Sequence, residues 1–162
     1  MTTAFIFPGQ GSQAVGMGKA LAENFSEARA VFAEVDEALG QKLSAIMFDG
    51  PEADLTLTAN AQPALMAVSL AVTRVLEAHA GLDIASQAKF IAGHSLGEYS
   101  ALAAAGTFSI ADTARLLRLR GDAMQKAVPV GEGAMAALLG ADYATGVAIA
   151  EEAAQGQVCQ IA

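Results

Sequence analysis

Apolar and polar positions along the first 129 residues form two short apolar runs and several longer segments with helical spacing. The run Thr3–Phe7 predicts a short buried strand and the run Lys89–Ala92 predicts a second short strand, because each is rich in β-prone residues and leads into a glycine-containing turn. Apolar residues at helical spacing predict helices over residues 18–39, 61–78, 96–105 and 110–128. Strands that alternate with helices predict a mostly parallel sheet covered by helices, which is an α/β fold.

Polar residues near two helix starts predict where those helices begin. Asn60 is expected to cap the helix over residues 61–78, and Pro63 is tolerated in its first turn. Ser109 is expected to cap the last of these helices, with Asp112 three positions on in a capping-box arrangement. The helix over residues 61–78 is apolar nearly all round, which predicts a place in the middle of a domain.

The pattern changes beyond residue 129. It predicts a linker at residues 131–133, strands over residues 134–139 and 157–162, and between them a helix over residues 142–154. We therefore expect residues 1–129 to form one domain and residues 130–162 to begin a second. The sequence stops inside the apolar run Val158–Ala162, and because natural domains rarely end on an unfinished buried strand, we expect a fragment of a longer chain.

Composition and charge narrow the functional classes. Hydrophobic residues make up 54% of the chain, but the apolar run Ala64–Val72 is too short to span ~30 Å of hydrocarbon, so no membrane partner is expected. Nine basic and seventeen acidic residues give a net charge of −8, which argues against nucleic acid as a partner. The single Cys159 excludes an intrachain disulfide and a cysteine-based zinc site, so no metal is expected. With no secretory signal pattern, the sequence predicts a cytoplasmic protein.

The pentapeptide Gly93-His94-Ser95-Leu96-Gly97 has the pattern G-x-S-x-G and lies between a predicted strand and a predicted helix. A sharp turn there would hold Ser95 in a strained conformation and expose its hydroxyl as a nucleophile. The start of the following helix would direct backbone N–H groups at a developing oxyanion. The alternative is a serine that only caps the helix.

A serine nucleophile needs a base, and the chain contains two histidines. His79 is predicted at a solvated helix end, and His94 is the immediate neighbour of Ser95, where side chains on a tight turn diverge. The histidine of a hydrolase triad follows the serine in the chain, but no histidine follows Ser95 here. Either there is no triad, or the base lies beyond residue 162.

Five segments occur together in order. They are F-P-G-Q-G-S-Q at residues 7–13, Q-P-A-L at 62–65, G-H-S-L-G-E-Y at 93–99, R-G-x-x-M-Q at 120–125 and G-A-M-A-A at 133–137. Together they resemble malonyl-CoA:acyl carrier protein transacylases and related acyltransferase domains. Several motifs in one order are far more specific than G-x-S-x-G alone.

This resemblance implies an α/β-hydrolase-like subdomain over residues 1–129 and the beginning of an inserted ferredoxin-like subdomain over residues 130–162. It implies that Ser95 takes a malonyl group from malonyl-CoA as an ester and passes it to the phosphopantetheine thiol of acyl carrier protein, in fatty acid biosynthesis. No bound cofactor is implied, because the coenzyme A thioester is a substrate. The family's catalytic histidine lies downstream of residue 162, so we expect a companion C-terminal part to be needed for turnover.

The same resemblance implies roles for individual residues. The backbone N–H groups of Gln10 and Leu96 would form an oxyanion hole, Arg120 would bind the malonyl carboxylate, and Met124 would line the acyl pocket. Helix geometry supports Arg120 separately, because it lies roughly 80° from the centre of its helix's apolar stripe, at the edge of a buried face. A guanidinium fork also matches a carboxylate in geometry.

The acidic balance bears on how an acidic carrier protein would dock. Because this chain is acidic overall, an acidic carrier would have to bind to a local patch of basic residues on its surface. The available candidates are Arg115, Arg118, Lys126 and Lys89.

Two other functions fit parts of the sequence. Gly9-x-Gly11-x-x-Ala14 after a strand, with Glu34 and Asp36 some twenty residues on, satisfies a loose dinucleotide-binding pattern. That pattern requires a second strand ending at the acid, where helical spacing is found instead. The other alternative is an acyltransferase-like fragment that binds its ligand without turnover, because the chain lacks a histidine base.

Overall fold

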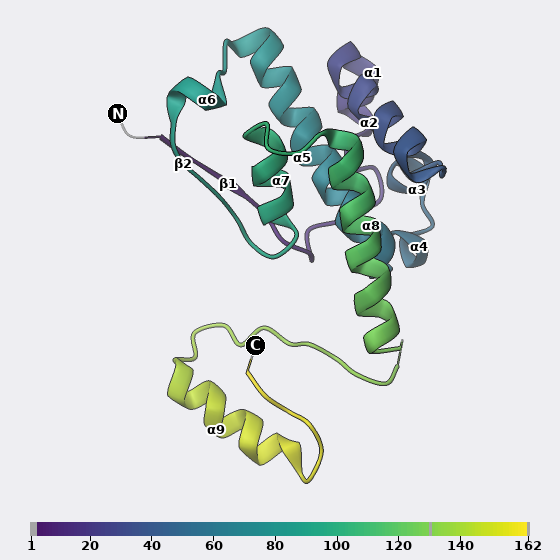
Figure 1. Ribbon diagram of the computed structural model, residues 1–162. Helices are drawn as coiled ribbons and strands as arrows, with labels where there is room; N and C mark the ends of the chain where they lie inside the picture. The colour runs from purple at the N-terminus through teal and green to yellow at the C-terminus, as the bar shows by residue number, and fades with distance from the viewer. Residues whose placement is uncertain (1–2, 130, 162) are drawn as a thin grey trace. The chain divides into compact units, whose positions relative to one another are not determined.

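The computed structural model describes residues 3–129 and 131–161. The chain divides into two compact units, residues 1–128 and residues 129–162 (Figure 1). The first unit combines helices with a small parallel sheet, as the α/β prediction requires.

The sheet consists of strands β1, Thr3–Phe7, and β2, Ala88–Gly93, which pair in parallel with Phe7 opposite Gly93. Helix α7, Gly97–Ala104, packs against both strands (Figure 1). Because the strands are parallel, the loops that leave their carboxyl ends meet at one edge of the sheet. This edge therefore receives both the segment after Phe7 and the turn around Ser95.

The prediction that the strand Thr3–Phe7 is buried is wrong, and the second strand is also largely exposed. Ile6 is 78% exposed and Phe90 is 60% exposed, whereas Phe7 is buried. Alternate side chains of a strand point to opposite faces of the sheet. Within the described residues only one face of this sheet is covered by a helix that packs on both strands, so the side chains on the other face remain in solvent.

Most of the first unit is helical. The helices other than α7 are α1, Lys19–Asn24; α2, Ser26–Leu39; α3, Leu43–Asp49; α4, Glu52–Thr56; α5, Thr58–Ala80; α6, Ile84–Gln87; and α8, Ile110–Ala127. The long helix α5 packs against α2, α7 and α8, so it lies in the middle of the unit as its apolar sequence predicts. The core between these helices includes Val35, Met66, Leu70 and Leu117, all nearly inaccessible to solvent.

Helix boundaries differ from the predictions at several places. The predicted helix over residues 18–39 is interrupted at Phe25, whose extended backbone ends α1 and begins α2. Arg29 satisfies carbonyl oxygens at the end of α1, donating to Ala22 O at 2.7 Å and to Glu23 O at 3.3 Å. The short helices α3 and α4 were not predicted, because each is too short to show a helical period.

The predicted cap at Asn60 is also wrong, because α5 begins at Thr58 and its N-cap is Leu57. Asn60 lies inside the first turn, and its side-chain amide donates to Asp54 O at 2.8 Å. Pro63 consequently lies in the second turn rather than the first. The side-chain bond of Asn60 thus joins α5 to α4 instead of capping its own helix.

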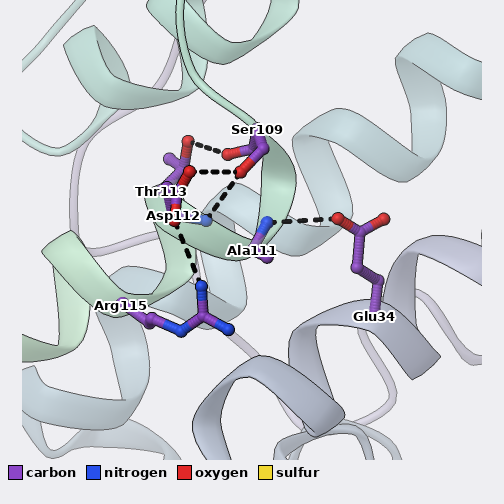
Figure 2. Close-up of polar contacts among 6 residues, drawn as sticks. All are labelled: Glu34, Ser109, Ala111, Asp112, Thr113 and Arg115. Carbon is purple, nitrogen blue, oxygen red and sulfur yellow. Dashed lines mark hydrogen bonds and ion pairs between the residues drawn. The ribbon is translucent and has the colours of Figure 1, made fainter.

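The cap at the start of α8 is confirmed. Ser109 Oγ accepts a hydrogen bond from the Asp112 N–H at 3.0 Å (Figure 2). The Asp112 carboxylate accepts from the Ser109 hydroxyl at 2.8 Å, which differs from a capping box, where it would accept from the backbone N–H. Glu34 of α2 accepts from the Ala111 N–H at 3.2 Å, so a second helix satisfies another free donor of the first turn (Figure 2).

In the second unit, helix α9, Tyr143–Ala154, confirms the predicted helix, and Asp142 caps it by accepting from the Thr145 N–H at 2.8 Å. Neither predicted flanking strand is found among residues 131–161. The side chains of Leu138 and Ile161 nevertheless both approach Gly146 of α9. A strand needs a neighbour with which to exchange backbone hydrogen bonds, and the two flanking segments pack on the helix rather than pair with each other.

In the part of the chain that the structure describes, no helix combines the length and apolar character required to cross a bilayer.

Candidate active site

Ser95 lies on a strained turn between β2 and α7. Its φ is +55°, a left-handed conformation that non-glycine residues rarely adopt. Gly93 and Gly97 permit the turn, because a Cβ on either would collide with backbone: that of Gly97 for Gly93, and that of Phe7 for Gly97. Ser95 is exposed, and Leu96 is the buried N-cap residue of α7. The strand–turn–helix context that G-x-S-x-G requires is therefore present.

The segment after β1 lies directly against this turn. The His94 N–H donates to Phe7 O at 3.1 Å, and a Cβ on Gly9 would collide with the His94 ring. These contacts bring the loop that carries Gln10 to the serine turn, as parallel pairing of the two strands predicts.

Arg120 reaches Ser95 from helix α8. Its Nη2 donates to Ser95 Oγ at 2.9 Å, and its Nη1 donates to Gln62 Oε1 at 2.5 Å. The guanidinium carbon also lies 5.9 Å from the centre of the Tyr99 ring. The half-buried Arg120 is thus held between α5 and α7 with its charge beside the serine hydroxyl.

Met124 lies one turn beyond Arg120 on α8. Its sulfur accepts a hydrogen bond from Gln62 Nε2 at 3.3 Å, and the side chain is 41% exposed. Gln62 therefore connects the two residues of α8 that the sequence singles out. The apolar stripe predicted for α8 is buried at Ala114, Leu117 and Gly121 but emerges into solvent at Met124.

Gln10 is held by the first residue of α5. Its side-chain nitrogen donates to Thr58 Oγ1 at 3.0 Å, and its side-chain oxygen lies 3.2 Å from the same hydroxyl. Over residues 3–129 and 131–161, no backbone hydrogen bond is made by the N–H of Gln10 or by that of Leu96. Neither donor is therefore used within the described part of the chain.

Neither histidine is placed to act as base for Ser95. His79 lies near the C-terminal end of α5, where its Nε2 is 3.4 Å from Glu27 Oε2 and its ring contacts Phe25. His79 lies roughly 25 Å along α5 from Gln62, the residue that bonds to Arg120 beside the serine. His94 packs its ring on Gly9, and the hydrogen bond to the Ser95 hydroxyl comes from Arg120 instead.

Glu27, the acidic residue beside His79, has a pKa shifted by its surroundings. The pKa of Glu27 is lowered, first by its own backbone N–H and then by the His79 side chain. Glu27 lies in the first turn of α2, where its negative charge also interacts favourably with the positive N-terminal end of the helix dipole. His79 is thus an exposed residue at a helix end, as the sequence predicts, with a carboxylate beside it.

Of the four basic residues proposed for the docking patch, Arg118 is not fully exposed. Arg118 is half-buried, its Nη2 donates to Gln41 Oε1 at 2.8 Å, and burial lowers its pKa. Arg118 therefore joins α8 to the turn between α2 and α3. Arg115, Lys126 and Lys89 are exposed, as expected for the rest of the patch.

No group of three His, Cys, Asp or Glu side chains within the described ranges could hold a metal ion. The dinucleotide-binding alternative fails on the fold, because residues 31–39 belong to helix α2. Its two acids are already engaged, since Glu34 binds the start of α8 and Asp36 binds Ser44 through both carboxylate oxygens.

Comparison with known families matches residues 4–157 to the acyl transferase domain. The chain belongs to the acyl transferase domain family. The malonyl CoA-acyl carrier protein transacylase of Bacillus subtilis strain 168 is 53% identical over 139 residues, which cover 86% of this chain and 42% of that protein. The same enzyme of Escherichia coli K12 is 48% identical over 155 residues, which cover 96% of this chain and 49% of that protein.

Solved structures of acyl transferases have the same fold. The acyl-carrier-protein-S-malonyltransferase of Bartonella henselae matches with a TM-score of 0.93 and 65% identity, covering all of this chain and 51% of that one. A malonyl-transacylase solved in complex with its type II PKS acyl-carrier protein matches with a TM-score of 0.87 and 44% identity, over 98% of this chain and 50% of that one. The chain thus spans about half the length of the acyl transferases that it matches.

Proposed function

We propose that this chain provides the nucleophile and the acid-recognising half of a malonyl-CoA:acyl carrier protein transacylase of fatty acid biosynthesis. The observation that carries the proposal is the hydrogen bond from Arg120 Nη2 to Ser95 Oγ, made at an exposed, strained turn. It sets a fixed positive charge next to a nucleophile, where an acyl group ending in a carboxylate would need one. The names of the relatives support malonyl as that acyl group.

In the proposed reaction, Ser95 Oγ attacks the thioester carbonyl carbon of malonyl-CoA. The serine proton passes to a base, the C–S bond breaks, and coenzyme A leaves as a thiol once it has taken a proton. The phosphopantetheine thiol of acyl carrier protein then attacks the serine ester by the same steps and releases the serine hydroxyl. The free N–H groups of Gln10 and Leu96 would stabilise each tetrahedral oxyanion.

Arg120 would bind the malonyl carboxylate, and Met124 would form part of the wall around the acyl chain. A guanidinium that donates to the serine oxygen also leaves the serine proton free for a base and favours negative charge on that oxygen. No resident cofactor is needed for this chemistry, since the activated acyl group arrives as a coenzyme A thioester.

The base would come from the remainder of the acyl transferase domain. Within the described residues neither histidine bonds to Ser95: His79 contacts Glu27 and the ring of His94 lies against Gly9, which supports a base supplied by residues outside this chain. We also propose that residues 1–129 form part of an α/β-hydrolase-like subdomain and that residues 130–162 begin a ferredoxin-like one. The division of the chain into compact units near Val128 supports this boundary.

The direct test is covalent labelling. The chain together with the remainder of the acyl transferase domain is incubated with malonyl-CoA, and its peptides are analysed by mass spectrometry. We expect a malonyl ester on Ser95 that disappears when holo acyl carrier protein is added. Ser95→Ala should abolish the label, whereas Ser26→Ala, at an exposed serine outside the site, should retain it. An enzyme that binds malonyl-CoA but never carries the ester would be a binding fragment instead.

A further inference from the structure

Gln62 is a polar side chain in the apolar interior, where it is stable only if its amide is hydrogen-bonded. It is completely buried within the apolar helix α5, where an unpaired amide would be strongly unfavourable. Both halves of the amide are paired: the oxygen accepts from Arg120 Nη1 and the nitrogen donates to Met124 Sδ. Its two partners are therefore the residues that would face the acyl group.

Close contact between α5 and α8 makes this bridge possible. At Gly121 the two helices approach so closely that a Cβ would lie 2.6 Å from Ala59 Cα and 2.8 Å from Thr58 O. Gly121 is flanked on α8 by Arg120 on one side and, three residues on, by Met124. The glycine thus brings the backbone of α8 within reach of a glutamine side chain one turn along α5.

We propose that Gln62 is the positioning residue that holds Arg120 ready for a terminal carboxylate, and that it thereby determines the selectivity of the site for acyl groups with a second acid. The inference rests on the proposed function. A free arginine side chain samples many rotamers, and ordering it on binding lowers affinity. Gln62 fixes Nη1 in advance, so that Nη2 and the exposed side of the guanidinium remain directed at Ser95 and the acyl group.

The neutrality of Gln62 is part of this role. A glutamate in its place would also anchor the guanidinium, but it would neutralise the charge that the substrate carboxylate needs. A glutamine anchors by one hydrogen bond and leaves the full positive charge for the ligand. Gln62 does not touch the reacting atoms in this arrangement, so its effect on transfer must act through Arg120.

The test is Gln62→Met in the complete acyl transferase domain, a change that preserves side-chain length and removes both hydrogen bonds. We expect malonyl kcat/KM to fall about tenfold or more, the effect of losing a hydrogen bond to a charged group, mainly through KM. Acetyl kcat/KM should fall by a smaller factor, because only the contact of Arg120 with Ser95 is weakened, and the acetyl transfer that remains also shows that the variant is folded. In the Arg120→Ala background, Gln62→Met should have no further effect on malonyl transfer.

Gln41→Met is the matched control, because Gln41 accepts from Arg118 on the same helix but is outside the site. It should leave the ratio of malonyl to acetyl transfer unchanged. Equal losses for the two acyl groups in Gln62→Met, or losses that add to those of Arg120→Ala, would overturn the inference.

A measurement that does not depend on turnover separates this inference from the proposed function. In NMR spectra of ¹⁵N-arginine-labelled protein, Gln62→Met should speed the rotation of the Arg120 guanidinium, and Gln41→Met should not. If the wild-type enzyme forms no malonyl ester, the proposed function fails and these spectra alone decide whether Gln62 holds Arg120. Unchanged Arg120 spectra in Gln62→Met would refute the inference even in an active enzyme.

Discussion

Arg120 Nη2 lies 2.9 Å from Ser95 Oγ, so one guanidinium contacts the nucleophile and faces the space that an acyl group on this serine would occupy. This double contact predicts two separable effects of Arg120→Ala. Loss of the bond to Ser95 should weaken transfer of any acyl group, whereas loss of the carboxylate partner should weaken malonyl transfer alone.

The measurement is kcat/KM for malonyl-CoA and acetyl-CoA in the complete domain. A charge-assisted hydrogen bond contributes about 1.5–3 kcal/mol, so malonyl kcat/KM should fall about tenfold to a hundredfold more than acetyl kcat/KM. Arg120→Lys should restore malonyl transfer only in part, because it keeps the charge but not the planar fork. Equal losses for the two substrates would remove Arg120 from carboxylate recognition.

Thr58→Val tests the other side of the site, where the Thr58 hydroxyl holds the Gln10 side chain. Valine keeps the branched shape and removes the hydrogen bond, so the loop that carries the Gln10 N–H should become less ordered. Loss of a neutral hydrogen bond corresponds to about 0.5–1.5 kcal/mol, so kcat should fall about twofold to tenfold. Malonyl and acetyl transfer should fall by the same factor, because an oxyanion forms in both. Thr56→Val, at an exposed threonine two residues earlier, should change neither.

Local pattern predicted the two strands and the longer helices of the first unit, but not the break at Phe25 or the short helices α3, α4 and α6. The strand before Gly93 and the helix after Leu96 follow from short-range spacing, and the strained Ser95 conformation follows from the glycines on either side of it. Burial of the strands could not be predicted in the same way. Whether Ile6 is covered depends on which elements pack on the sheet, and the sequence of a strand does not contain that information.

Gln62 was part of a recognised motif, but its role was not predicted. The available signal was a lone glutamine among Ala61, Pro63, Ala64 and Leu65, where a buried amide requires partners. Spacing along the chain could not identify those partners, because they lie 58 and 62 residues away on another helix. The half-buried state of Arg118 was missed for the same reason, since its partner Gln41 lies 77 residues earlier.

Gly121→Ala should lower stability. Alanine is the better helix former by about 0.8–1.0 kcal/mol, but a Cβ here would press on backbone atoms of Thr58 and Ala59, which cannot rotate away. Overpacking typically destabilises by about 1–3 kcal/mol, so after the gain in helix propensity the net loss should be up to about 2 kcal/mol. Denaturant unfolding measures it, with Ala123→Ser on the exposed face of α8 as the control. A variant as stable as the wild type would show that α5 and α8 are not tightly packed at this point.

Helix α9 should depend on pH through its cap. The pKa of Asp142 is lowered below its ordinary value of 3.8, first by the Thr145 hydroxyl and then by the Thr145 N–H. A lowered folded-state pKa means that the cap stabilises α9 fully above the ordinary range of an aspartate, and that this contribution is lost as the pH falls through the folded-state value. Hydrogen exchange across α9 should therefore show protection that decreases at acidic pH. Asp142→Ala should remove that pH dependence, whereas Glu151→Gln, at an exposed position within α9, should keep it.

The proposed carrier-docking surface should consist of Arg115, Lys126 and Lys89 without Arg118. Arg115 is exposed, and among the described residues its ion-pair partner is Asp112 one turn earlier, at 3.1 Å, a contact that solvent and salt weaken readily (Figure 2). Arg115→Glu with Lys126→Glu should raise the apparent KM for acyl carrier protein, and the increase should be largest at low salt, where charges on a rim act over the longest range. Arg118→Glu should behave differently, because it would place a carboxylate against Gln41 Oε1 and lower stability rather than carrier affinity alone. Thermal unfolding of both variants distinguishes the two effects, and a KM for the carrier that is independent of ionic strength would place the docking surface outside this chain.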